Sequence, residues 1–134
     1  MKKILSFFAV MLFAFAVNAA TTVSPTAEKN NLSAAVAAAT AGDVLELTNG
    51  IFNEEGNFAI DKDLTIKAAE GAKPIIKNLY YFRVESGAKV TFQGIEFDGS
   101  GASDHCLRSH NGSNGSEEVT LGHFAFHKYP SYVL

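Results

Sequence analysis

Cysteine and tryptophan are nearly absent from this sequence. Its 134 residues include one cysteine, Cys106, and no tryptophan. A single cysteine excludes an internal disulfide, so buried apolar side chains and hydrogen bonds must stabilise the fold. A strong excess of charge is also missing, because 11 basic residues stand against 14 acidic ones and the formal net charge is −3. A mildly acidic chain of this kind is not typical of proteins that bind nucleic acid or an anionic membrane.

The sequence also lacks an apolar run long enough to cross a membrane. Lys2 and Lys3 precede an uncharged stretch from Ile4 to Val17, and such a stretch is shorter than the roughly 20 residues that a spanning helix needs. Val17-Asn18-Ala19 then provides the small residues of a signal-peptidase site. The sequence therefore predicts a signal peptide over residues 1–19. We expect a secreted protein, in the periplasm or on the outer surface of a Gram-negative bacterium.

One segment after this leader has helical character. Residues 20–30 are polar and contain Pro25, which predicts a linker, and residues 31–42 are rich in alanine. Asn30-Asn31 can cap a helix, and Gly42 can supply its left-handed end. Four apolar side chains recur at helical spacing and define one buried face: Leu32, Ala35, Val36 and Ala39.

From residue 43 to the end, apolar and polar residues alternate in short runs separated by turns rich in Gly, Asn and Asp. The segment Val90–Asp98 repeats as Val119–His127, 29 residues later. Leu64-Thr65-Ile66 precedes the first copy by 26 residues. Periods of this size indicate stacked supersecondary units.

The repeat contains a corner. Val90 and Phe92 have one parity, whereas Ile95 and Phe97 have the other, so both pairs can face inward only if the chain turns at Gln93-Gly94. The second copy turns at the matching place, Gly122-His123. Stacked coils would then form two inner columns and one outer column: Leu64, Val90 and Val119; Ile66, Phe92 and Leu121; Thr65, Thr91 and Thr120. The pattern favours a parallel β-helix, with an antiparallel sandwich or meander as the alternative.

The stretch Ala38–Phe52 resembles the first coil of right-handed parallel β-helix proteins that act on polysaccharides, in particular lyases of the chondroitinase B and alginate lyase type. In that family a helix with the pattern Ala-x-x-Ala-x-x-Gly-Asp covers the N-terminal end. A turn of the form Gly-x-aromatic follows, which Gly50-Ile51-Phe52 matches, and Ile60–Ile66 looks like the second coil. The resemblance implies an all-β fold: a right-handed parallel β-helix of about three coils over residues 43–134, incomplete at the C-terminus, with residues 31–42 as a short N-terminal capping helix.

The resemblance implies a polysaccharide partner, which could be uronate-containing, but transfers no catalytic residue. In those lyases a Lys and an Arg act as base and acid, and calcium neutralises the uronate carboxylate. No motif here matches them, so we predict no cofactor in this chain. We expect a secreted domain that binds or displays polysaccharide without a complete active site. Two alternatives stay open: the N-terminal portion of a lyase that cleaves uronate glycans by β-elimination, for which calcium could be a cofactor, and a truncated fragment without independent activity.

Parity and position suggest where a glycan would bind. The outward parity of Glu96, Asp98 and His127 places them on the outer surface, with Asp98 and His127 equivalent one coil apart. Tyrosines stack on sugar rings and arginine pairs with uronate carboxylates, and three such residues lie near coil corners. The predicted carbohydrate-binding residues are therefore Tyr80, Tyr81, Arg83, Glu96, Asp98 and His127.

Other polar clusters do not support a metal site. Asp98–Asp104 could wrap calcium with its oxygens but is better explained as a solvated turn. His105 and His110 lack the cysteine spacing of a zinc site, and Cys106 fits a buried small apolar position. At the C-terminus, Tyr132–Leu134 reads as the start of a strand, which predicts self-association through an uncapped coil.

Overall fold

The computed structural model describes residues 19–85, 87–100, 107–109 and 118–127. The predicted signal-peptide segment and the C-terminal Tyr132–Leu134 lie outside these residues. No helix in the described ranges is long and apolar enough to cross a membrane. The elements, in chain order, are β1 (Thr21–Val23), α1 (Asn31–Ala38), β2 (Asp43–Leu47), β3 (Gly50–Ile60), β4 (Leu64–Ala68), β5 (Pro74–Val84), β6 (Lys89–Gln93), β7 (Glu96–Asp98), β8 (Leu107–Ser109), β9 (Glu118–Gly122) and β10 (Ala125–His127).

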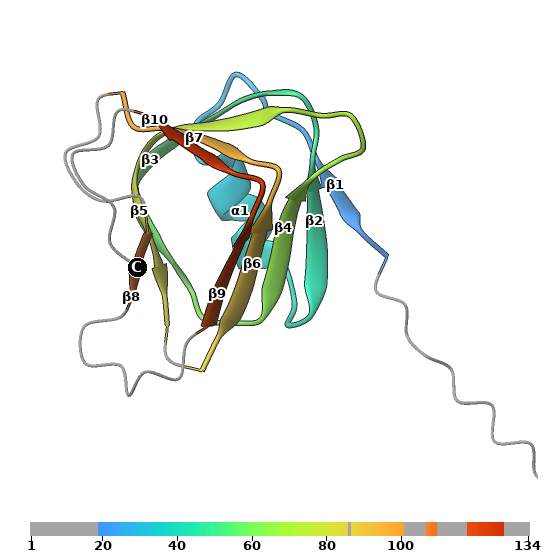
Figure 1. Cartoon of the computed structure of the whole chain (residues 1–134), viewed down its shortest axis with the longest axis vertical. Coiled ribbons are helices and arrows are strands. Elements are labelled where there is room, and N and C mark those ends of the chain that lie inside the picture. Colours follow the sequence, from blue (N-terminus) through green and yellow to red (C-terminus); the bar gives the residue numbers. More distant parts are fainter. Residues whose placement is uncertain (1–18, 86, 101–106, 110–117, 128–134) are drawn as a thin grey trace, which may run out of the picture.

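From β2 to β7, successive strands alternate between two sheets (Figure 1). Sheet A has the order β1-β2-β4-β6-β9, and sheet B has the order β10-β7-β5-β3, with β8 paired to the second half of β5. Every strand pair among the described residues is parallel. Parallel pairing with a return to the same sheet one turn later is the arrangement of a coiled stack. The antiparallel sandwich or meander is therefore wrong, and an all-β fold of parallel sheets with one short helix is confirmed.

The register confirms the internal repeat residue by residue. In sheet A, Leu64 pairs with Val90 and Val90 with Val119. In sheet B, Phe97 pairs with Phe126, so the offset of 29 residues holds on both sides of the corner. The three columns expected from the sequence are present in sheet A: two contain the apolar residues, and Thr65, Thr91 and Thr120 form the third.

The corner between sheets A and B needs a left-handed backbone. Gly94 has φ 71°, and His123, at the equivalent place in the second copy, has φ 47°. The Gly94 N–H donates to the carbonyl oxygen of Gly122 at 2.9 Å, which joins the two corners. A Cβ on Gly94 would lie 3.0 Å from the Cβ of Ala68. Glycine therefore fits this corner for two reasons, the positive φ and the close approach of the neighbouring coil.

The core lies between the two sheets and is filled by side chains of the predicted inner columns. Phe82, Phe92 and Phe97 come from three strands and pack with ring centroids 5.0–5.8 Å apart. Tilted and edge-to-face pairs at these distances add to the free energy gained by burial. The inward parity of Ile95 and Phe97 beyond the corner is confirmed, because both side chains are buried.

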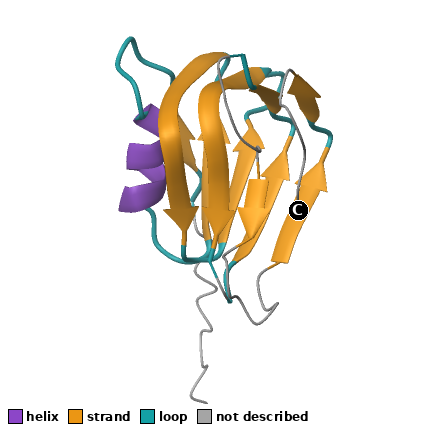
Figure 2. Cartoon of the chain, turned by 90° about the vertical axis from the view of Figure 1, so that its left-hand side faces the viewer, coloured by secondary structure: helices purple, strands orange, loops and turns teal. Residues whose placement is uncertain are grey.

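One end of the stack is covered by the N-terminal segment, as Figure 2 shows for α1. The helix packs against β3, and β1 pairs with β2 at the edge of sheet A. Strand β1 lies within the range expected to be a linker. The predicted apolar face of the helix is confirmed: Leu32 and Val36 are buried, and Ala35 and Ala39 pack against the core.

The expected helix caps are wrong at both ends of α1. Asn30 makes no side-chain cap, and its Oδ1 instead accepts a hydrogen bond from the Glu55 N–H at 2.7 Å. Glu54 of β3 caps the helix: its carboxylate, fully buried, accepts from the N–H groups of Leu32 and Ser33 at 2.8 and 3.2 Å and from the Ser33 hydroxyl. At the other end the chain becomes extended directly after the helix, and Gly42 (φ 90°) forms the later turn into β2.

Candidate functional site

A row of polar residues crosses the outer surface of sheet B. The register pairs Asn53 with Lys77, Lys77 with Asp98, and Asp98 with His127. We call these four positions the outer row. Neighbouring parallel strands lie about 4.8 Å apart, so Asn53, Lys77 and Asp98 are in reach of the same ligand.

The outward direction of the row follows from burial of its neighbours. Phe52, Ile76 and Phe97 are buried, and each directly precedes a member of the row. Because side chains alternate along a strand, Lys77 and Asp98 face away from the core, and both are half-buried. The outward parity predicted for Asp98 is confirmed.

Asp98 is held in place by its own loop. Its Oδ1 accepts hydrogen bonds from the N–H and the hydroxyl of Ser100, at 2.9 and 2.5 Å. A carboxylate has acceptor capacity beyond two bonds. Asp98 is therefore oriented by the turn, and its carboxylate is the kind of acceptor to which sugar hydroxyls donate.

Glu96 lies beside the outer row. It precedes Asp98 by two residues on β7, faces the same side, and is half-buried. Its register neighbours are Ile75 and Ala125. These neighbours carry no charge. Glu96 therefore adds one polar residue beside the outer row but does not belong to a second row of charged residues.

The structure separates the remaining predicted residues from the outer row. Tyr80, Tyr81 and Arg83 lie on the second half of β5, which pairs with β8 and with the end of β3. Arg83 is six residues beyond Lys77, about 20 Å along an extended strand. A single small sugar cannot contact both groups, although a polysaccharide could.

Arg83 already has a carboxylate partner. Its Nε donates to Oε1 of Glu85 at 2.8 Å, and both side chains are partly exposed. In the register, Arg83 lies between Ala59 and Arg108. The register thus pairs two arginine positions on adjacent strands, and Arg108 is absent from the residues predicted from the sequence.

Lys77 and Asn53 were also missed. The segment Ile75-Ile76-Lys77 pairs with Glu96-Phe97-Asp98, and the sequence carries a signal for it. Gly71 (φ 71°) marks a turn before this run, and Ile76 has the apolar inner position that Phe97 has one coil later. Aligning Ile75-Ile76-Lys77 with Glu96-Phe97-Asp98, the part of the repeat after the corner, would have placed Lys77 beside Asp98.

No group of three or more His, Cys, Asp or Glu residues that could hold a metal ion occurs in the part of the chain that the structure describes. Most of the Asp98–Asp104 loop, together with His105, Cys106 and His110, lies outside that part. The role of the six predicted residues in carbohydrate binding stays a prediction.

No protein-family model matches the chain, and a search of curated proteins finds no match. Among solved structures, the chain is similar to a PL6 family alginate lyase, AlyGC, with a TM-score of 0.68 and 24% sequence identity. The match covers 80% of this chain and 15% of that chain. At this identity the likeness shows the fold alone: the chain has the fold of a part of a polysaccharide lyase.

Proposed function

With this likeness as the premise, we propose that the chain is a right-handed parallel β-helix domain, of about three coils, in an exported protein that binds or displays polysaccharide. The outer row of sheet B carries the proposal. It presents a cation at Lys77, an acceptor at Asp98 and an amide at Asn53 across adjacent strands. Uronate glycans offer carboxylates for the first and hydroxyls for the other two.

The test is binding of alginate and chondroitin sulfate to the full mature chain, measured by affinity electrophoresis and calorimetry. We expect Lys77→Met to weaken binding about fivefold, because one exposed charge pair is lost. Lys89→Met is the matched control, since it removes the same charge from the start of β6 in sheet A. Equal loss in both variants would show that only net charge matters and would refute the outer row as the site.

A second candidate function is the N-terminal portion of an eliminative lyase, which the likeness in fold to part of an alginate lyase favours. β-Elimination needs a base and a charge-neutralising group within hydrogen-bond reach of one sugar carbon. The described residues show no such convergence, because Lys77 and Arg83 lie far apart along β5. We expect no unsaturated uronate from alginate, chondroitin or dermatan, with or without calcium. Product absorbance above a heat-killed control, lost in Arg83→Ala, would support the lyase.

The proposal includes self-association through the C-terminal coil. Phe124, in the corner between β9 and β10, is 41% exposed. Val119 and Leu121 of β9 are partly buried. A partly covered apolar surface beside strand edges favours pairing with another chain.

A further inference from the structure

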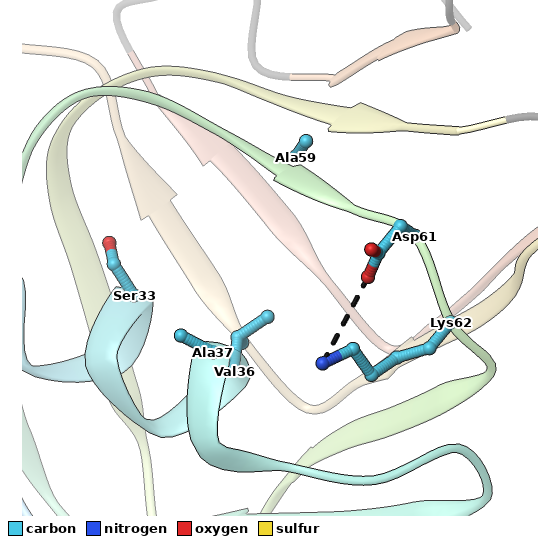
Figure 3. Close-up of a pocket in the computed structure, with 6 residues that line it drawn as sticks. All are labelled: Ser33, Val36, Ala37, Ala59, Asp61 and Lys62. Atoms are coloured by element: carbon cyan, nitrogen blue, oxygen red, sulfur yellow. Dashed lines mark ion pairs between the residues drawn. The ribbon is translucent and has the colours of Figure 1, made fainter.

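A cavity of about 310 Å³ lies between α1 and the turn that joins β3 to β4 (Figure 3). We call it the α1 pocket. A volume near the lower limit of the roughly 300–1,000 Å³ usual for ligand sites suits one small ring. Its lining residues are Ser33, Val36, Ala37, Ala59, Asp61 and Lys62. None of them belongs to the outer row, so the α1 pocket is a separate site.

Lys62 brings donors to this pocket. Its amine donates to the carbonyl oxygen of Ala39, after the last turn of α1, at 3.0 Å. It also forms an ion pair with Asp61, whose Oδ1 is 3.9 Å away. That second distance is too long for a direct hydrogen bond. An ammonium group has three N–H donors. Among the described residues only the Ala39 carbonyl oxygen accepts one of them, so two remain for a ligand.

Asp61 brings acceptors from the same turn, and Figure 3 shows a dashed ion pair between its carboxylate and the Lys62 amine. The Asp61 side chain is 72% exposed and that of Lys62 is 23% exposed. Ammonium only donates and carboxylate only accepts. The two side chains together therefore present a donor and an acceptor next to each other with no net charge.

This chemistry matches the two adjacent hydroxyls of a neutral sugar, since one can accept from Lys62 while the other donates to Asp61. Ala37 and Ala59 are exposed and give an apolar wall for the C–H face of the ring. Because the Lys62 charge is already paired with the Asp61 carboxylate, a uronate carboxylate gains no net attraction at this pocket and meets the like charge of Asp61. That repulsion lowers the affinity of a charged sugar.

We propose that the α1 pocket binds one neutral pyranose residue through vicinal hydroxyls and discriminates against the corresponding uronate. The inference rests on the proposed function in taking a sugar as ligand, but it assigns a different place on the molecule and a different charge of the sugar.

The test is a nuclear magnetic resonance titration of the full mature chain with the methyl glycosides of glucose, galactose and mannose, each beside its uronate. We expect at least one neutral glycoside to shift the amide signals of Ala37, Ala59 and Lys62. Its uronate should bind roughly fivefold more weakly, as expected for a like charge a few ångströms away near the surface. Absence of shifts with all three neutral glycosides would overturn the proposal.

One substitution tests the expected preference for a neutral sugar over its uronate. Asp61→Asn removes the repulsive charge at an exposed position and leaves Lys62 in place, so the preference for the neutral sugar should fall about fivefold. An unchanged ratio of the two affinities would refute the role of Asp61.

Two matched variants separate binding from folding. Ala37→Leu fills the α1 pocket, whereas Ala34→Leu changes an exposed residue of the same helix that does not line it. We expect the first to abolish the shifts and the second to keep them, with similar thermal melts. Equal sugar binding by both would place the ligand elsewhere. Lys77→Met should weaken alginate binding and leave the pocket unchanged, so failure of either proposal can be recognised independently.

Discussion

The N-terminal and C-terminal ends of the strand stack differ in how their apolar side chains are covered. At the first end, Leu32, Leu47 and Phe52 are all buried, because α1 packs on β3 and β1 extends sheet A. At the other end, the described residues include Phe124 at 41% exposure and Leu121 only partly buried. A stack of coils buries each coil with its neighbours, so its terminal coils need a separate cover.

Backbone hydrogen bonds join the N-terminal segment to the first coil. The Asn30 N–H donates to the carbonyl oxygen of Asn53 at 2.8 Å, and the Thr48 N–H donates to that of Val23 at 3.0 Å. The first residues of the described chain thus satisfy backbone groups of β3 and of Thr48, which directly follows β2. Edge strands protected in this way do not pair with other chains.

The largest expected effect comes from truncating one phenylalanine at each end. Phe52→Ala should lower the free energy of unfolding by about 3–5 kcal/mol, because it removes a fully buried ring. Phe124→Ala should cost about 1 kcal/mol or less, since much of that ring is already exposed. Chemical denaturation of both variants measures the contrast. Similar midpoints would mean that the C-terminal end is packed as tightly as the N-terminal end.

The next effect concerns the buried carboxylate that fastens the N-terminal cover. Glu54→Ala leaves the N–H groups of Leu32 and Ser33 without their acceptor, so it should cost about 3 kcal/mol. Glu55→Ala is the matched control, because it removes the neighbouring carboxylate from an exposed pair with Lys29 and should cost under about 1 kcal/mol.

Hydrogen exchange identifies where that loss acts. In Glu54→Ala the amides of Leu32 and Ser33 should exchange faster, while amides of β6 change less. Uniform acceleration throughout the chain would indicate that Glu54 supports the whole fold and does not act mainly through α1.

A third difference between the two ends concerns self-association of the chain. Sedimentation velocity across a range of concentrations should show a reversible dimer of the mature chain. Phe124→Asp places a charge in the exposed apolar surface and should weaken that dimer about tenfold. The same substitution at Ile51, an exposed residue near the covered end, is the control. A monomer at every concentration would refute association through this surface.

Sequence reasoning succeeded where the pattern is local and repeated. The offset of Val90–Asp98 and Val119–His127 fixed the register in both sheets, because each coil buries the same parity of residues. It failed where one contact joins distant segments. Glu54 lies 22 residues from its partner Leu32, and a glutamate in an alternating run gives no sign of being buried.

The candidate site shows the same limit. Asp98 and His127 were paired from the repeat and confirmed as neighbours, whereas Lys77 was missed because its coil was aligned only through Leu64-Thr65-Ile66. The separation of Arg83 from Asp98 could not be read from parity either. That separation arises because β5 is long: its first part pairs with β7 and its second part with β8. Alternation of apolar and polar residues does not reveal the length of a strand.

The last comparison concerns the two corners, where His123→Gly is expected to change the free energy of unfolding least. His123 holds a left-handed φ of 47° that costs a non-glycine residue free energy, whereas Gly94 holds φ 71° without that cost. His123→Gly should therefore raise the free energy of unfolding by up to about 1 kcal/mol, reduced by the extra freedom that glycine gives the unfolded chain. Gly94→Ala should lower it by about 1–2 kcal/mol through backbone strain, and contact with the Ala68 Cβ adds to this cost. Thermal melts of the two variants should shift in opposite directions. A destabilised His123→Gly would show that the His123 side chain makes a stabilising contact at the C-terminal end that outweighs its strained backbone.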